Sequence, residues 1–148
     1  MKKAILLLLV VVAVSLFAGC MSSQEDNEEA YLYLTSNIDD NEAIKAYLEN
    51  EAARGNDIDA KIKNGDTILM IAARFTTNIE VIRTIASYYP SIHQMNYKTD
   101  MTAIDYLTRR EGTKEMVTLL AEESVKQELR NKANETKDSI VKGIFSKF

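Results

Sequence analysis

The fold is decided by the stretch Asn64-Gly65-Asp66-Thr67-Ile68-Leu69-Met70-Ile71-Ala72-Ala73. In it a turn leads to Asp66-Thr67, which can cap a helix, and an almost wholly apolar segment follows. Two residues recur at a spacing of 35. Thr102 repeats the helix-capping Thr67, and Glu115 repeats Glu80, the residue that opens the next helix. A period of this length with two helices in it is typical of a solenoid of stacked helix pairs.

The same helix signals occur on both sides of this stretch. Polar caps followed by apolar residues at helical spacing predict short helices that begin near residues 27, 41, 67, 78, 102 and 114. Gly55 ends the second helix, and Pro90 stands 35 residues further along at the corresponding place. Two irregular stretches lie before Thr67 and Thr102. The composition, with one proline and five glycines, suits an all-α domain.

These segments resemble the ankyrin repeat. Residues 64–73 match its Gly-x-Thr-Pro-Leu-His-x-Ala-Ala opening, and Met101-Thr102-Ala103-Ile104-Asp105 matches the Thr-Ala-Leu-Asp variant. Residues 55–61 resemble the Gly-Ala-Asp-Val-Asn-Ala-Lys segment that links repeats. The resemblance covers residues 29–122 as two clear repeats and one degenerate leading repeat. It implies an all-α, ankyrin-like helix-pair solenoid of about three repeats.

The repeats depart from the family pattern at several positions. Ile68 and Ala103 replace its proline, Met70 and Asp105 replace its histidine, and Asp100 replaces its turn glycine. The alternative is another helix-pair repeat, such as the tetratricopeptide repeat. Its Trp-Leu-Gly-Tyr pattern and longer, equal helices are missing here, so the ankyrin-like interpretation is preferred.

Residues 124–148 show apolar side chains three and four residues apart, which predicts an amphipathic helix. A solenoid needs capped ends, so we expect this helix to cover the last repeat, with residues 131–134 as a break in it. The alternative is that residues 140–148 dock on a partner, or on a membrane through Lys137, Lys142 and Lys147.

The N-terminus predicts a cleaved signal. Lys2 and Lys3 precede an apolar run over residues 4–18, too short to span a bilayer. Residues 16–20, Leu-Phe-Ala-Gly-Cys, resemble the lipobox of bacterial lipoproteins, which implies that Cys20 is lipidated, although Phe17 departs from the usual leucine. Cys20 is the only cysteine, so no intramolecular disulfide can form. An ordinary signal or an uncleaved anchor is the alternative.

The resulting organisation has four parts. We expect a signal peptide at 1–19, a lipidated cysteine with a short tether at 20–27, a repeat domain at 28–123 and a helical cap at 124–148. The seven residues 21–27 span at most about 25 Å, which places the domain close to a membrane. It would be lipid-anchored in the bacterial envelope, on the outer face of the cytoplasmic membrane or the periplasmic side of the outer membrane.

Charge and motifs limit the classes of function. Residues 20–148 carry 16 basic and 22 acidic side chains, which argues against nucleic-acid binding. His93 is the only histidine, and no phosphate loop, dinucleotide turn or paired-cysteine zinc pattern occurs. The pairs Asp39-Asp40 and Asp57/Asp59 fit cap and turn roles. We therefore expect a monomeric binding protein with no enzyme activity, cofactor or metal.

Carrying over the positions that ankyrin stacks present on their concave face gives a candidate protein-binding surface of twelve residues. Six of them are basic and one is acidic in an acidic chain, which predicts a partner with an acidic surface. The function would be that of a scaffold or an inhibitor of an envelope protein. The alternatives are an immunity protein that neutralises a secreted toxin and an enzyme with an unrecognised site. The twelve residues are Lys61, Lys63, Asn64, Asp66, Arg74, Phe75, Asn96, Lys98, Thr99, Met101, Arg109 and Arg110.

Overall fold

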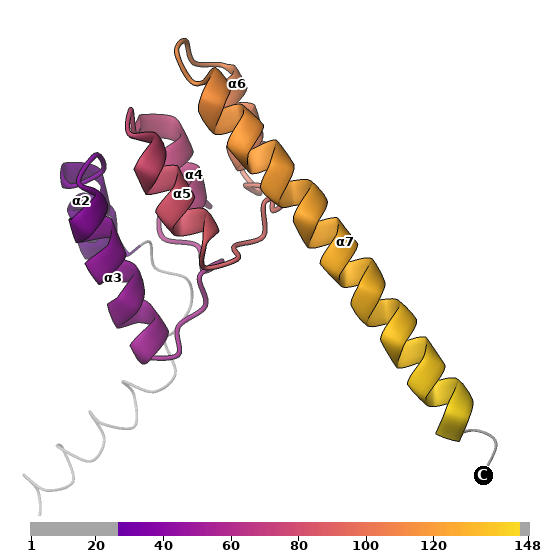
Figure 1. Ribbon diagram of the computed structural model, residues 1–148. Helices are drawn as coiled ribbons and strands as arrows, with labels where there is room; N and C mark the ends of the chain where they lie inside the picture. Colours follow the sequence, from indigo (N-terminus) through magenta and orange to yellow (C-terminus); the bar gives the residue numbers. More distant parts are fainter. Residues whose placement is uncertain (1–26, 146–148) are drawn as a thin grey trace, which may run out of the picture.

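The computed structural model describes residues 27–145, which form six α-helices and no β-strand apart from one isolated bridge (Figure 1). The predicted all-α class is thereby confirmed. The predicted signal peptide, Cys20 and most of the tether lie outside the described residues, as do residues 146–148. The helices are α2 (Glu28–Ser36), α3 (Asn41–Ala53), α4 (Ile68–Phe75), α5 (Ile79–Ala86), α6 (Ala103–Thr108) and α7 (Lys114–Phe145).

Five of these helices begin at the residues that the sequence marks as caps. The side chains of Asn27, Asp40, Thr67 and Asn78 accept hydrogen bonds from backbone N–H groups in the first turns of α2, α3, α4 and α5. At α6, Thr102 and Asp105 form a capping box, in which the side chain of each accepts a hydrogen bond from the backbone N–H of the other. Each cap satisfies donors that a helix leaves unpaired, so local sequence fixes where the helices start.

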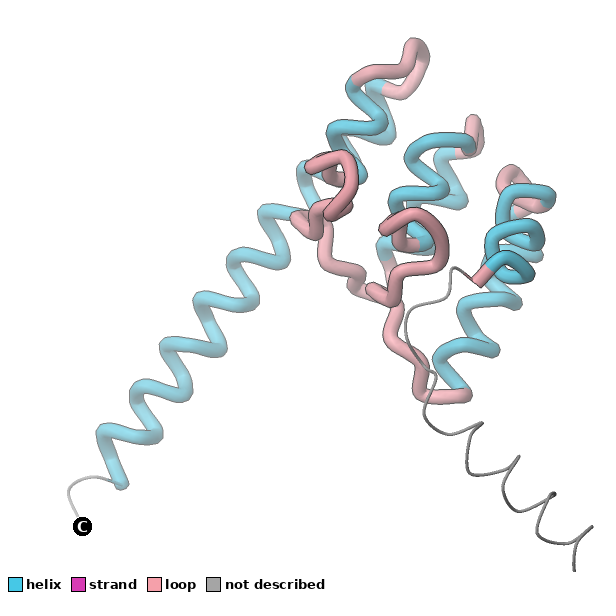
Figure 2. Tube along the Cα trace, turned by 180° about the vertical axis from the view of Figure 1, so that it is seen from behind, coloured by secondary structure: helices cyan, strands magenta, loops and turns pink. Residues whose placement is uncertain are grey.

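The helices are arranged as three successive pairs, α2/α3, α4/α5 and α6/α7, as Figures 1 and 2 show. The first helices of the pairs form one row, in which α4 packs against both α2 and α6. The second helices form another row, in which α5 packs against both α3 and α7. The middle pair therefore contacts both neighbours and contributes more core residues than either of them.

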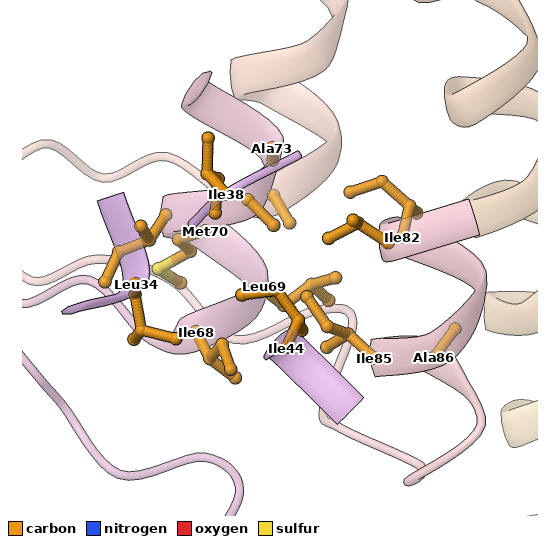
Figure 3. Close-up of a cluster of buried hydrophobic side chains, with 14 of the residues drawn as sticks. Leu34, Ile38, Ile44, Ile68, Leu69, Met70, Ala73, Ile82, Ile85 and Ala86 are labelled. Atoms are coloured by element: carbon orange, nitrogen blue, oxygen red, sulfur yellow. The ribbon is translucent and has the colours of Figure 1, made fainter. Parts of the chain in front are cut away.

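The core is continuous from the first pair to the last. All six residues of α4 from Ile68 to Ala73 are at most 2% exposed. Figure 3 shows side chains of the first pair meeting α4, with Leu34 beside Met70 and Ile44 beside Leu69. Burying such side chains contributes about 1.5–3 kcal/mol each, so the stack is held together mainly by apolar contacts between pairs.

Polar contacts join the short turns within successive pairs. The Asp39 carboxylate accepts hydrogen bonds from the Thr76 hydroxyl (2.7 Å) and the Thr77 backbone N–H (2.7 Å). The bond from Thr76 is the main cause that lowers the pKa of Asp39. On the next turn, the Arg110 guanidinium donates to the carbonyl oxygens of Ala73 (2.6 Å) and Thr76 (2.8 Å). Arg110 therefore binds backbone between pairs.

The predicted break in the C-terminal helix is wrong. α7 is one continuous helix of 32 residues, without a break at residues 131–134, and it extends away from the stack (Figure 1). Leu120 and Ser124 are buried, but Val125 and Leu129 are 56% and 62% exposed. The apolar stripe therefore lies on a different face of α7 from the one that packs, and only the first part of the helix covers the last pair.

The structure also corrects the place of the second loop's left-handed turn. Pro90 corresponds in sequence to Gly55, which has φ +72°, but Tyr89 is the residue with positive φ (+58°). The proline ring fixes φ near −65°, so the left-handed conformation moves to the preceding residue. Asp100 has φ +54° and does match Gly65 (φ +84°), as the alignment of the repeats predicts.

Candidate functional site

Two long loops, residues 54–67 and 87–102, connect successive helix pairs (Figure 2, pink). Each loop tip closes on itself through backbone hydrogen bonds. The Asp66 N–H donates to Lys63 O (2.9 Å), and the Asp100 N–H donates to Asn96 O (2.8 Å). The candidate binding residues therefore lie on ordered turns.

Asp66 organises this region from inside. It is 1% exposed, and its carboxylate accepts hydrogen bonds from Arg74 Nη1 (2.5 Å), Asn96 Nδ2 (2.5 Å) and Tyr106 OH (3.2 Å). The donors come from α4, the second loop and α6. A buried carboxylate is costly unless it is paired and hydrogen-bonded, and this one is both. Asp66 thus joins two repeats and is not available to a partner.

Asn96 makes the second link between the loops. Its side-chain nitrogen also donates to Asn64 O (3.1 Å), and its side-chain oxygen accepts from the backbone N–H of Lys98 (2.7 Å) and Thr99 (3.3 Å). Asn96 is 1% exposed and Met101 is 8% exposed. Both were predicted as surface contacts from their place in the repeat, but they support the surface from beneath.

Gly65 lies where the two loops approach most closely. A Cβ atom there would lie 2.8 Å from Asn96 Oδ1 and 2.8 Å from Tyr97 Cε1, and the residue has φ +84°. We expect Gly65→Ala to lower the free energy of unfolding by about 2–3 kcal/mol, from strain and the clash together. Urea denaturation measures this change.

Gly55→Ala is the matched control for this substitution. Gly55 has φ +72°, but a Cβ atom there meets nothing within 4 Å. Its replacement therefore reports backbone strain alone, about 1 kcal/mol. Equal losses for the two variants would show that the loops do not approach each other as described.

The predicted basic residues differ in how strongly they are held. Arg74 is ion-paired with Asp66, and its guanidinium lies 5.1 Å from the Phe75 ring centroid and 5.3 Å from that of Tyr106. Lys63 is ion-paired with Glu28 on α2. Together with Arg110, which binds backbone, these side chains already stabilise the fold.

Lys61 is half-buried beside the second loop. Its ammonium donates to Met95 O (3.4 Å), and burial lowers its pKa.

Exposed members remain on the surface formed by the two loops and the C-terminal ends of α4 and α6, which we call the loop face. Lys98 and Arg109 are exposed. The Lys98 ammonium hydrogen-bonds Asn64 Oδ1 (3.2 Å) and lies 5.7 Å from the Tyr97 ring centroid. Phe75 is 40% exposed. The loop face is defined by Lys61, Lys63, Asn64, Arg74, Phe75, Met95, Tyr97, Lys98, Thr99 and Arg109.

Sequence reasoning missed two exposed apolar members of the loop face. Met95 is 52% exposed and Tyr97 is 59% exposed, although both lie in a mostly polar loop. No local signal in the sequence marks them, because the buried Asn96 between them is fixed by Asn64 and Asp66, which lie 32 and 30 residues earlier in the chain. Large exposed apolar side chains beside cations are typical of protein interfaces.

The histidine and the aspartates considered as candidate catalytic or metal-binding residues make structural contacts in the loops. His93 Nε2 lies 2.7 Å from Ser124 Oγ on α7, and Asp59 accepts the Ser91 backbone N–H (2.8 Å). Within residues 27–145, no group of three or more His, Cys, Asp or Glu side chains could hold a metal ion. In the same part of the chain, no helix combines the length and apolar character needed to cross a bilayer.

The loop face therefore combines exposed aromatic and basic side chains with a base of buried polar contacts. No known protein family, curated protein or solved structure matches this chain. A function for this chain is therefore inferred from the geometry of the described residues.

Proposed function

We propose that this chain is a protein-binding module that receives an acidic surface of a partner on its loop face. The observation that carries the proposal is the exposure of Lys98 and Tyr97 on a loop that Asp66 and Asn96 hold in place, together with the exposure of Arg109 at the C-terminal end of α6. Because these loops are ordered before a partner arrives, little conformational entropy remains to be lost on binding.

Charge supports an acidic partner. Residues 27–124 carry 17 acidic and 10 basic side chains, yet the loop face as defined contains five basic side chains and no acidic one. Two of the five, Lys63 and Arg74, are ion-paired with Glu28 and Asp66. Arginine pairs with carboxylates in a bidentate geometry, and aromatic side chains supply apolar contact area at little entropic cost. The exposed Tyr97 beside Lys98, and the exposed Phe75 and Arg109 at the C-terminal ends of α4 and α6, offer both kinds of contact.

The fold proposal is an ankyrin-like solenoid of three helix pairs. Three observations support it: the pairs succeed each other in two rows, Thr67 and Thr102 cap the first helices of successive pairs, and positive φ recurs at Gly65 and Asp100. The shared register gives both loops the same position relative to their helices, and this brings them together into one face.

The location proposal is a lipid anchor on Cys20 in a bacterial envelope. The domain begins at Asn27, whose backbone N–H donates to Ile62 O in the first loop (2.6 Å). A tether from Cys20 would therefore enter the domain beside the loop face. A partner bound there would be held close to the membrane, which suits a scaffold or inhibitor of an envelope protein.

The test is reversal of the two exposed cations. We expect Lys98→Glu/Arg109→Glu to weaken retention of the partner at least tenfold, because like charges would then face an acidic surface. The measurement is quantitative capture of partner from detergent-solubilised cell envelopes by the tagged full chain. Arg74 is unsuitable for reversal, because its loss would leave Asp66 buried without its cation.

The matched control is Lys45→Glu/Lys114→Glu, which makes the same change of charge on exposed residues of α3 and α7. We expect this control to retain the partner. Equal retention by both variants would contradict the assignment of the loop face, and equal loss would show only a general charge effect.

A further inference from the structure

The charge of the described chain changes sign along the stack. Residues 27–56, the first pair, contain seven acidic and two basic side chains, a net charge of −5. Residues 57–124 contain ten acidic and eight basic side chains, a net charge of −2. Residues 125–145 contain three acidic and five basic side chains, a net charge of +2. Because α2/α3 and α7 stand at opposite ends (Figure 1), unlike ends of two copies attract each other.

The acidic end contains a hollow of about 460 Å³, lined by α2 and α3 and by the cap residues Asn27 and Arg54. Tyr33 and Tyr47 line it with stacked rings whose centroids are 5.9 Å apart. Its wall also contains Glu29, and Glu51 with its ion-pair partner Arg54 (3.7 Å). Tyr33 is 41% exposed, and the neighbouring Leu32 is 55% exposed. The first pair therefore offers aromatic area flanked by carboxylates.

The basic end offers the complementary surface. Beyond Ser124, α7 still contacts the second loop, where Gln127 Nε2 donates to Pro90 O (2.6 Å) and the Arg130 guanidinium lies 4.7 Å from the Tyr89 ring centroid. Val125 (56%) and Leu129 (62%), one turn apart on another face of the helix, are exposed. Lys132 and Lys137 are exposed on the same part of the helix. An amphipathic helix with cations beside its apolar residues matches a hollow with aromatic rings and carboxylates.

We propose that the chain assembles head to tail, with residues 125–142 of α7 from one copy docked in the α2/α3 hollow of the next. Two different surfaces of the chain meet, so the interface is heterologous. In each assembly the first copy keeps a free α2/α3 hollow and the last copy keeps a free α7. The loop face takes no part in this contact. The proposal is independent of the proposed function and departs from the monomer expected from sequence.

The experiment uses two differently tagged copies of the full chain, co-expressed and solubilised in mild detergent. One copy is captured, and the amount of the second is measured. We expect capture by the wild type, and at least a tenfold loss when both copies carry Glu29→Lys/Glu51→Lys at the head or Lys132→Glu/Lys137→Glu at the tail. Lys98→Glu/Arg109→Glu, outside both ends, leaves capture unchanged.

The decisive experiment co-expresses one copy with the charge-reversed head and one copy with the charge-reversed tail. A head-reversed copy and a tail-reversed copy present opposite charges to each other again, so we expect capture to recover. Circular dichroism and thermal melting check that each variant is folded.

Four outcomes would overturn the proposal. They are no capture by the wild type, unchanged capture by either reversed variant, loss without recovery in the mixture, and binding of α7 to anionic phospholipid vesicles in place of a second copy.

Discussion

Replacing Asp66 with alanine is expected to lower the free energy of unfolding by about 3 kcal/mol. The substitution removes one acceptor from Asn96 and Tyr106 and the carboxylate that is ion-paired with Arg74. Asn96 is buried, so its amide would stay in the interior with one of its partners lost. Removing a partner from a buried hydrogen-bonded charge costs several kcal/mol, because the remaining groups cannot recover water. Urea denaturation followed by circular dichroism measures the change.

Asp138→Ala is the control for this prediction. Asp138 is exposed on the projecting part of α7, so its replacement should change stability by no more than about 0.5 kcal/mol. A loss at Asp66 below about 1 kcal/mol would show that its carboxylate is not the link between the loops.

The second large effect is expected at Leu120 on α7, which is fully buried. Leu120→Ala should lower the free energy of unfolding by about 2–5 kcal/mol, because it removes apolar contacts and leaves a cavity between α7 and the neighbouring helices. Leu129 lies on the same helix but is 62% exposed. Leu129→Ala should therefore change stability by less than about 0.5 kcal/mol.

This pair of leucines tests the arrangement of α7 directly. A C-terminal segment that folded back as a cap would bury Leu129 and make both substitutions costly. Comparable losses at the two positions would contradict the projecting helix, and a loss at Leu120 alone would support it. The same urea experiment gives both values.

Helix starts could be predicted from sequence because their causes are local. Thr67 and Thr102 each lie within three residues of the N–H group that they cap, so a short window contains the whole interaction. The two-helix period could be predicted for a related reason. Apolar residues recur at the spacing that faces a neighbouring pair, and Leu69 and Ile82 lie in the core as that pattern requires.

The burial of Asp66 could not be predicted in the same way. Its donors Asn96 and Tyr106 lie 30 and 40 residues further along the chain, so nothing near Asp66 in sequence shows that a carboxylate there is enclosed. The repeat register correctly placed Asp66 beside Asn64 and Arg74. The register alone does not show whether a side chain is exposed on the binding surface or buried beneath it. For the same reason Asn96 and Met101 were assigned to the wrong side of the loops.

The burial of each face of α7 also depends on residues that are distant in sequence. Its apolar spacing predicts a helix with one apolar face, and that much holds for Val125 and Leu129. Whether the face is covered depends on which residues α5 and α6 contact, and they contact the face that contains Leu120. Asparagine costs only a few tenths of a kcal/mol in a helix, so residues 131–134 do not interrupt it.

The central claim, that the loop face binds a protein, is tested most directly by site-specific photo-crosslinking in intact cells. A crosslinking side chain is placed at Lys98 or Arg109 on the loop face, and at Lys45 or Lys114 on the outer helices. We expect both loop-face positions to crosslink to the same protein, and neither outer position to do so. Crosslinks to that protein from the outer positions alone, or none from either loop-face position, would contradict it.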